Sequence, residues 1–256
     1  MKAVDNIMGI EIKQRLDQIA SLPLEWHLAG TMSGVVLRAI AAQAEKLGPI
    51  QRSAETGSGK STLLFSNLSA NHKVFALDCG DSISRVKNSQ LLNSSTVTFI
   101  EGPSQLTLPR HVFEEKLQVV LIDGPHGYPF PDLEYYYFYP HIAVGGLLLI
   151  DEINIPSIKS MFEIVRAGDM FELVELAFLR RTEAPLIDPL SDSWWLQGVN
   201  RSHYEYSMAL DQGLPSSRFR LVTRLIPPQL KRLVPQSWKK GLLKAWARVS
   251  ESSHRS

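Results

Sequence analysis

The feature that most limits the fold is a set of short apolar runs, each of which ends on an acidic residue. The runs are residues 73–77, 118–122 and 147–150, and the acids that follow them are Asp78, Asp123 and Asp151. Runs that are apolar throughout and are separated by helical segments are typical of parallel strands buried on both faces. Since the carboxyl ends of parallel strands meet at one edge, where open α/β sheets bind ligands, the sequence predicts an acidic ligand-binding edge.

Apolar periodicity predicts further elements before, between and after these runs. Helices are expected at residues 33–47, 61–68, 85–92, 132–139 and 158–167, and strands at residues 50–55, 96–100, 171–181 and 219–225. The first of these strands is unusually polar, but it leads into a glycine turn. We divide the chain into an N-terminal helical cap (1–48), a ligand-binding domain (49–226) and a C-terminal tail (227–256).

Composition excludes several classes of protein. The 256 residues carry a net charge of +1, which gives no general reason to expect nucleic acid as a partner. Cys79 is the only cysteine, so an intrachain disulfide is impossible. The charged N-terminal segment does not resemble a signal peptide, and no run of eighteen apolar residues occurs. A cytoplasmic location is therefore expected.

The glycine turn at residues 53–62 admits three interpretations. Gly57 and Gly59 allow the backbone to approach a ligand, and the helix start that follows favours an anionic group. A phosphate-binding loop for ATP matches the Gly-Lys-Ser end, and Asp123 could then serve Mg²⁺, but Ala54 stands where the first glycine is required. A dinucleotide loop requires a third glycine where Thr62 stands.

Charge favours the third interpretation, S-adenosylmethionine. Asp78 follows the loop at the spacing expected of an acid that binds ribose hydroxyls. Glu55, Asp123 and Asp151 suit a cofactor with cationic ammonium and sulfonium groups, and Glu55 would repel a triphosphate. The carboxylate of the methionine part can meet the helix N-terminus at residues 60–62.

At this point the chain resembles class I S-adenosylmethionine-dependent methyltransferases, in particular the small-molecule O-methyltransferase-like branch (methyltransferase family 24-like). The motifs that carry the resemblance are Glu55-Thr56-Gly57-Ser58-Gly59-Lys60-Ser61, the acid Asp78, Glu101-Gly102-Pro103-Ser104-Gln105, Asp123-Gly124-Pro125-His126-Gly127-Tyr128 with Asp132, and Gly145-Gly146 through Asp151-Glu152. The resemblance spans residues 30–182. It implies a doubly wound, mostly parallel, seven-stranded Rossmann-like sheet with helices on both faces and an antiparallel edge strand.

The resemblance and the charge argument together name candidate site residues. Those expected to bind the cofactor are Glu55, Gly57, Ser58, Gly59, Ser61, Asp78, Ser104, Gln105 and Asp123. His126 is the candidate general base for a hydroxyl acceptor, with Asp123 beside it; alternatively His126 only caps its turn or contacts adenine. Lys60 is interpreted as a solvated residue at a helix start.

A divalent cation such as Mg²⁺ is a second way to activate the acceptor. Asp123, Asp151 and Glu152 lie at the ends of adjacent predicted strands and could supply oxygen ligands. The alternative is that the two aspartates serve the cofactor and helix caps while Glu152 is solvated. The sequence leaves both open.

Aromatic and amide residues in the segment 185–200 suit a small-molecule or sugar acceptor, and equally suit a loop folded over the core. In the tail, apolar and basic residues alternate around Trp238 and Trp246. That pattern is typical of an amphipathic helix at the inner face of a membrane, or of packing on the domain or on a second subunit in a homo-oligomer. The rival functions are a phosphate-loop nucleotide hydrolase using Gly59-Lys60-Ser61 and a non-catalytic cofactor-binding module.

Overall fold

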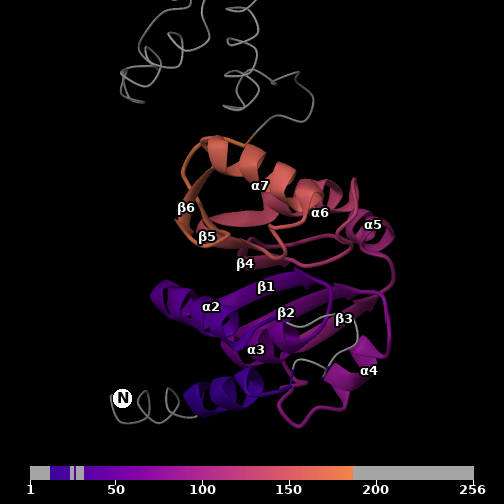
Figure 1. Ribbon diagram of the computed structural model, residues 1–256. Helices are drawn as coiled ribbons and strands as arrows, with labels where there is room; N and C mark the ends of the chain where they lie inside the picture. The colour runs from indigo at the N-terminus through magenta and orange to yellow at the C-terminus, as the bar shows by residue number, and fades with distance from the viewer. Residues whose placement is uncertain (1–11, 24–25, 27–31, 187–256) are drawn as a thin grey trace, which may run out of the picture. The chain divides into compact units, whose positions relative to one another are not determined.

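The computed structural model describes residues 12–23, 26 and 32–186, which contain a seven-stranded sheet (Figure 1). The strands are β1 (Ile50–Thr56), β2 (Ser69–Ala76), β3 (Val97–Glu101), β4 (Leu117–Ile122), β5 (Ile142–Ile150), β6 (Phe171–Glu175) and β7 (Phe178–Arg181). Their order is β3-β2-β1-β4-β5-β7-β6, and β7 runs antiparallel to both of its neighbours. The chain reverses its direction of travel across the sheet between β1 and β4, which makes their carboxyl ends the switch point for ligand binding.

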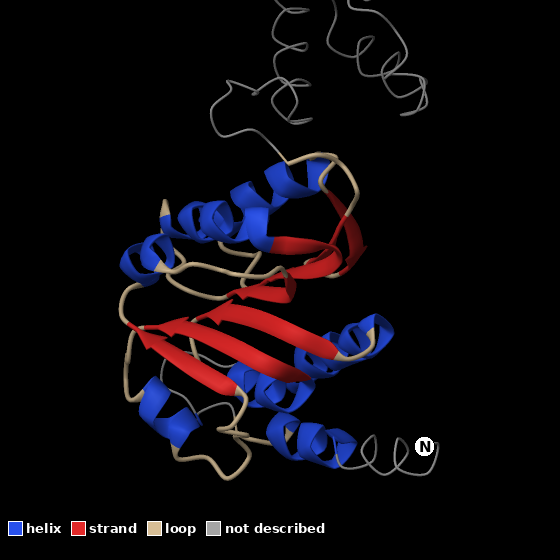
Figure 2. Cartoon of the chain, turned by 180° about the vertical axis from the view of Figure 1, so that it is seen from behind, coloured by secondary structure: helices blue, strands red, loops and turns tan. Residues whose placement is uncertain are grey.

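Helices cover both faces of this sheet (Figure 2). They are α2 (Gly34–Leu47), α3 (Lys60–Leu68), α4 (Ser82–Lys87), α5 (Ser104–Thr107), α6 (Phe130–Phe138) and α7 (Pro156–Ala167), besides a helical stretch at residues 12–20. Successive residues of β4 face opposite sides of the sheet. Val119 and Leu121 pack in the core with α2 and α3, whereas Val120 and Ile122 pack in the core with α6 and α7. The predicted doubly wound, mostly parallel fold is therefore confirmed.

The polar strand β1 lies in the middle of the sheet, between β2 and β4. Ser53, Glu55 and Thr56 are all buried there. Buried polar groups are tolerated when they are hydrogen-bonded, and each of these side chains has a partner on another element. The polar residues that made this segment a poor strand by composition thus form side-chain hydrogen bonds at the centre of the fold.

The predicted strand at 171–181 is wrong in one respect, because this segment forms a hairpin of two strands. Leu176 has a positive φ of 48° and turns the chain between β6 and β7. The antiparallel strand therefore lies second from the edge, and β6 forms the edge. The helix expected at 85–92 is also shorter and earlier, at Ser82–Lys87.

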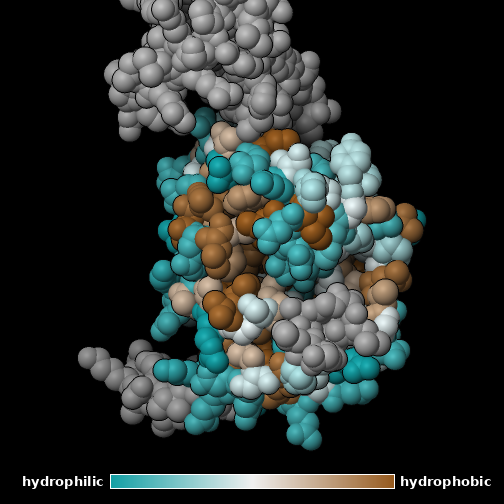
Figure 3. Space-filling model, viewed as in Figure 1, coloured by the Kyte–Doolittle hydropathy of each residue, from teal (hydrophilic) through white to brown (hydrophobic). Residues whose placement is uncertain are grey.

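Several predictions fall outside the described residues, among them the strand at 219–225, most of the loop at 185–200 and the tail at 227–256. Internal contacts divide the chain into units at 1–189 and 190–256. Within the described part, no helix is both long and apolar enough to cross a membrane. Figure 3 shows apolar surface gathered where β5 and β6 lie, and Val144, Leu173 and Leu176 are exposed apolar residues of that region.

Candidate functional site

The glycine turn joins β1 to α3 and lies against the end of β4. Gly57 has a φ of +81°, a conformation that side chains rarely adopt. A Cβ atom placed on Gly57 would lie 2.3 Å from the carbonyl oxygen of Asp123. The loop therefore passes so close to the backbone after β4 that only glycine fits, and the two segments form one continuous edge.

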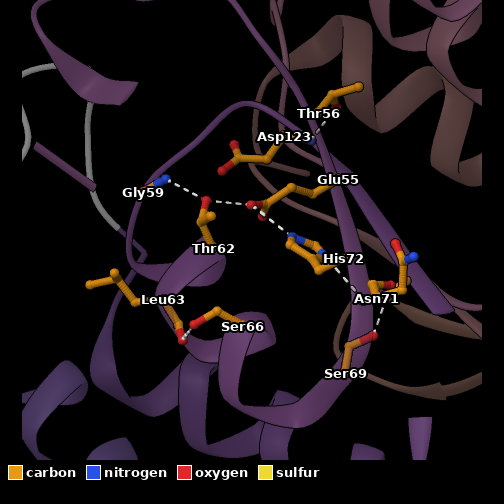
Figure 4. A network of polar contacts seen from close by, with 11 residues as sticks. Glu55, Thr56, Gly59, Thr62, Leu63, Ser66, Ser69, Asn71, His72 and Asp123 are labelled. Carbon is orange, nitrogen blue, oxygen red and sulfur yellow. Dashed lines mark hydrogen bonds and ion pairs between the residues drawn. The ribbon is translucent and has the colours of Figure 1, made fainter. Parts of the chain in front are cut away.

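A buried carboxylate supports this loop from below (Figure 4). Glu55, whose exposed fraction is 0%, accepts a short hydrogen bond from the hydroxyl of Thr62, which in turn accepts the N–H of Gly59 at 3.0 Å. On its other side, Glu55 Oε1 lies 3.2 Å from Nε2 of His72, and His72 Nδ1 lies 2.8 Å from the hydroxyl of Ser53. Because a carboxylate only accepts, His72 donates through Nε2; in the neutral imidazole Nδ1 then accepts from the hydroxyl of Ser53.

These contacts differ from the role expected of Glu55. The sequence suggested that its carboxylate faces the ligand directly, whereas the structure places Oε1 beneath the loop and links it to Gly59 through Thr62. The second oxygen, Oε2, is buried and has no hydrogen-bond partner among the described residues. One oxygen thus holds the loop, and the other is an acceptor still to be satisfied.

The solvated position expected for Lys60 is wrong. Its side chain is only 2% exposed, and its ammonium group donates a 2.6 Å hydrogen bond to the carbonyl oxygen of Leu22. Leu22 comes from the N-terminal segment, far from the loop in sequence. The lysine therefore ties that segment to the start of α3.

We expect Thr62→Val to loosen the glycine turn, because the variant removes both the donor to Glu55 and the acceptor for Gly59. The buried carboxylate of Glu55 then loses a partner, at a cost of about 1–3 kcal/mol, and the half-buried N–H of Gly59 loses its acceptor as well. Thr62→Ser keeps the hydroxyl and serves as the control. Urea unfolding should show lower stability for the valine variant alone, and equal stability of the two variants would contradict this support role.

Asp123 and His126 form a pair at the end of β4. His126 Nε2 lies 3.6 Å from Asp123 Oδ1, and the side chains are 37% and 28% exposed respectively. Burial, with added repulsion from Asp151 and Glu55, raises the pKa of Asp123 to about 7, although the hydrogen-bonding interaction with His126 acts in the opposite direction. The same interaction with Asp123 raises the pKa of His126. The titration of each side chain therefore depends on the charge of the other.

The backbone of His126 is held in place by α7. The hydroxyl of Ser157, in the first turn of this helix, donates a short hydrogen bond to the carbonyl oxygen of His126. This bond fixes the main chain at His126. The imidazole itself is partly exposed, so the ring can reach a ligand at the edge of the sheet.

The predicted cation site is not assembled in the described part of the chain. No group of three or more His, Cys, Asp or Glu side chains is placed there to hold a metal ion. Asp151 accepts the N–H of Glu152 at 2.9 Å, and Glu152 is exposed with a φ of +53°. Asp151 therefore bonds within its own turn and Glu152 is solvated, whereas the helix cap expected of Asp151 is not formed, because α7 begins after Ile155 without a side-chain cap.

The other predicted cofactor residues lie around the same edge. Asp78 is exposed at the end of β2 and accepts hydrogen bonds from the N–H of Ile83 and the hydroxyl of Ser84. Ser58 donates to Ser82 at 3.3 Å, and Ser61 is buried in the first turn of α3. Gln105 carries a buried Oε1 without a partner among the described residues.

Residues 54–153 match the sequence model of a family described as a methyltransferase domain, although the match covers less than half of the chain. This part of the chain is similar to a methyltransferase domain. No curated protein sequence matches the chain.

Three solved structures are similar to this chain at low identity. A protein assigned as an O-methyltransferase from Klebsiella pneumoniae has 16% identity and a TM-score of 0.49, over 65% of this chain and 87% of that one. The S-adenosylhomocysteine-bound methyltransferase of Podospora anserina has 12% identity and a TM-score of 0.47, over 72% and 97%. An rRNA methylase from Streptococcus thermophilus has 17% and 0.42, over 58% and 96%.

One buried residue of the matched segment was missed by reasoning from sequence. Glu134 in α6 is 1% exposed and accepts hydrogen bonds from the hydroxyls of Thr56 at 2.8 Å and Ser104 at 2.6 Å. Burial raises its pKa to about 7, even though these bonds favour the charged form. The signal in the sequence was a single acid beside the aromatic run 135–139, which does not reveal what the acid contacts.

Proposed function

We propose that the chain transfers a methyl group from S-adenosylmethionine to a small-molecule or sugar acceptor, at a hydroxyl oxygen. The observation that carries this proposal is the charge of the binding edge. The carboxylates of Asp78 and Asp123 line it, while the one lysine of the glycine turn is buried and donates to Leu22. An acidic edge without this cation suits a positively charged cofactor and opposes a triphosphate.

The residues present fit the cofactor by their chemistry. The missing Cβ of Gly57 leaves room for close approach, and the N-terminus of α3 favours a carboxylate. Each carboxylate oxygen of Asp78 has a lone pair beyond the bonds it makes to α4, so it can still accept ribose hydroxyls. Gln105 Oε1 would satisfy its acceptor capacity with an amine donor such as that of adenine. When bound, the cofactor supplies a methyl group on a sulfonium centre.

His126 is proposed as the base that takes the proton of the acceptor hydroxyl, while Asp123 orients the imidazole and stabilises its charged form. We expect His126→Ala to lower kcat by about 100-fold, the lower end of the usual contribution of a positioned base. The affinity for S-adenosylhomocysteine should stay unchanged, because the cofactor is held by other residues. Methylation at the wild-type rate would remove the base role and leave His126 as a turn residue.

Calorimetry with S-adenosylhomocysteine and with ATP tests the proposal directly. We expect the first to bind and ATP with Mg²⁺ to give no heat. Binding and hydrolysis of ATP would instead support a nucleotide hydrolase. Binding of S-adenosylhomocysteine without turnover on panels of glycans, phenols and amines would favour a non-catalytic module.

The acceptor can be sought by incubating a cell extract with the protein and isotopically labelled S-adenosylmethionine, followed by mass spectrometry of the products. A labelled hydroxylated small molecule or sugar is expected. Label found only on nitrogen atoms would contradict transfer to oxygen while leaving methyl transfer itself intact.

A further inference from the structure

The buried carboxylate of Glu134 touches three segments that meet at the binding edge. Thr56 ends β1 just before the glycine turn, and Ser104 begins α5 after β3. The N–H of Gly124, directly after β4, donates to the same carboxylate. The donors are far apart in sequence, and no other described side chain hydrogen-bonds to all three segments.

The contact with the segment after β4 is tight. A Cβ atom on Gly124 would lie 1.9 Å from Glu134 Oε1, so the carboxylate fills the space that a side chain would need. The hydroxyl of Thr56 also accepts the N–H of Asp123 at 3.0 Å while it donates to Glu134. Glu134 therefore holds the backbone of Asp123 through Thr56 and that of Gly124 directly.

We propose that Glu134 is the positioning residue of the binding edge, which fixes the ends of β1 and β4 and the start of α5 relative to one another. The inference rests on the proposed function, since these segments are the ones expected to surround the cofactor and to carry the Asp123–His126 pair. Burying a carboxyl group weakens folding, so the benefit of this arrangement is geometric: in its ionised form, one rigid group satisfies three donors. Reorganisation of a site by even 1 Å lowers rates by about 100-fold.

Glu134→Gln tests this link with little change in shape. An amide has one acceptor oxygen and a donor, so either Thr56 or Ser104 must reverse its hydrogen bond. If Thr56 reverses, its hydroxyl must accept from the new amide as well as from the N–H of Asp123, and its own hydrogen loses residue 134 as an acceptor, which weakens its hold on Asp123. We expect the amides of Asp123 and Gly124 to exchange with deuterium at least about 10-fold faster, while those of β5 are unchanged.

Two variants of Thr56 separate the link to Asp123, which passes through Thr56, from the direct link to Gly124. They also replace Glu134→Gln as the test if that variant does not fold. Thr56→Val removes the hydroxyl, so the amide of Asp123 should exchange faster while that of Gly124 stays protected. Thr56→Ser keeps the hydroxyl and should leave both amides as in the wild type. Glu163→Gln, which changes an exposed acid on α7, controls for the loss of a carboxylate elsewhere.

Affinity for S-adenosylhomocysteine is measured on the same proteins, and Glu134→Gln should weaken it by about 10-fold. Unchanged exchange at Asp123 and Gly124, equal acceleration of all amides, or faster exchange with unchanged affinity would each overturn the proposal. If the wild type fails to bind S-adenosylhomocysteine, the proposed function fails, whereas the exchange rates still decide whether Glu134 holds the edge.

Discussion

Replacing Gly57 with alanine should abolish measurable binding of S-adenosylhomocysteine. The residue has a φ of +81°, and the new Cβ would lie 2.3 Å from the carbonyl oxygen of Asp123. Because both partners are backbone, neither can move aside alone, and the glycine turn must separate from the end of β4. A shift of about 1 Å would lower affinity by about 100-fold or more, and strain would cost about 3 kcal/mol of stability.

Gly48→Ala is a matched control for this variant. Gly48 has a similar φ of +75°, but a Cβ atom added to it would have nothing within 4 Å, and it ends α2 away from the edge. Its ψ of −156° places it in a backbone region that is essentially restricted to glycine, so only a conformational cost of about 1–3 kcal/mol applies there. Calorimetry should show wild-type affinity for Gly48→Ala. Wild-type affinity in Gly57→Ala would show that the turn does not need its contact with β4.

Stability should depend on pH through Glu134, with the sign set by its raised pKa. The pKa of this carboxyl is about 7 in the folded protein against an ordinary value of 4.5. The folded state therefore holds more protons than the unfolded state between pH 4.5 and 7. The contribution of this group to the free energy of unfolding is therefore fully present below about pH 4.5. It falls by about 3 kcal/mol in total as the pH rises to about 7.

Glu134→Gln removes this titration, so the difference in unfolding free energy between variant and wild type isolates it. We expect that difference to shift by about 3 kcal/mol in favour of the variant from pH 4.5 to 7.5. Urea unfolding at a series of pH values measures it. The unfolding free energy of Glu163→Gln, a change on the exposed face of α7, should vary with pH as that of the wild type does. Parallel curves for Glu134→Gln would mean that its carboxyl is not protonated near neutrality.

The parallel strands and their acidic ends could be predicted from sequence because each rests on local pattern. A buried strand between two layers of helices needs an unbroken apolar run, as at 118–122, and the chain leaves that run at a turn where Asp123 is tolerated. The hairpin at 171–181 was missed because its turn contains Leu176 and Ala177, with no glycine or proline to mark it.

The side-chain contacts within the site could not be predicted from local sequence pattern. Lys60 donates to Leu22, 38 positions earlier, and Thr56 donates to Glu134, 78 positions later. Sequence spacing carries no information about such contacts, because they depend on how separate elements pack. For the same reason, acids at strand ends suggested a cation site, yet in the structure Asp151 accepts the N–H of Glu152, and Glu152 is exposed.

Amino-acid pattern alone therefore established the layered α/β class, the acidic edge and the glycine turn, since strand burial and backbone freedom follow from residue type at short range. Tertiary structure decided which charges face the edge. It buried the lysine of the turn, placed Oε1 of Glu55 under the loop and brought Glu134 to the junction of three segments. The physical reason is that the cost of burying a charge can be met only by partners that the folded chain supplies.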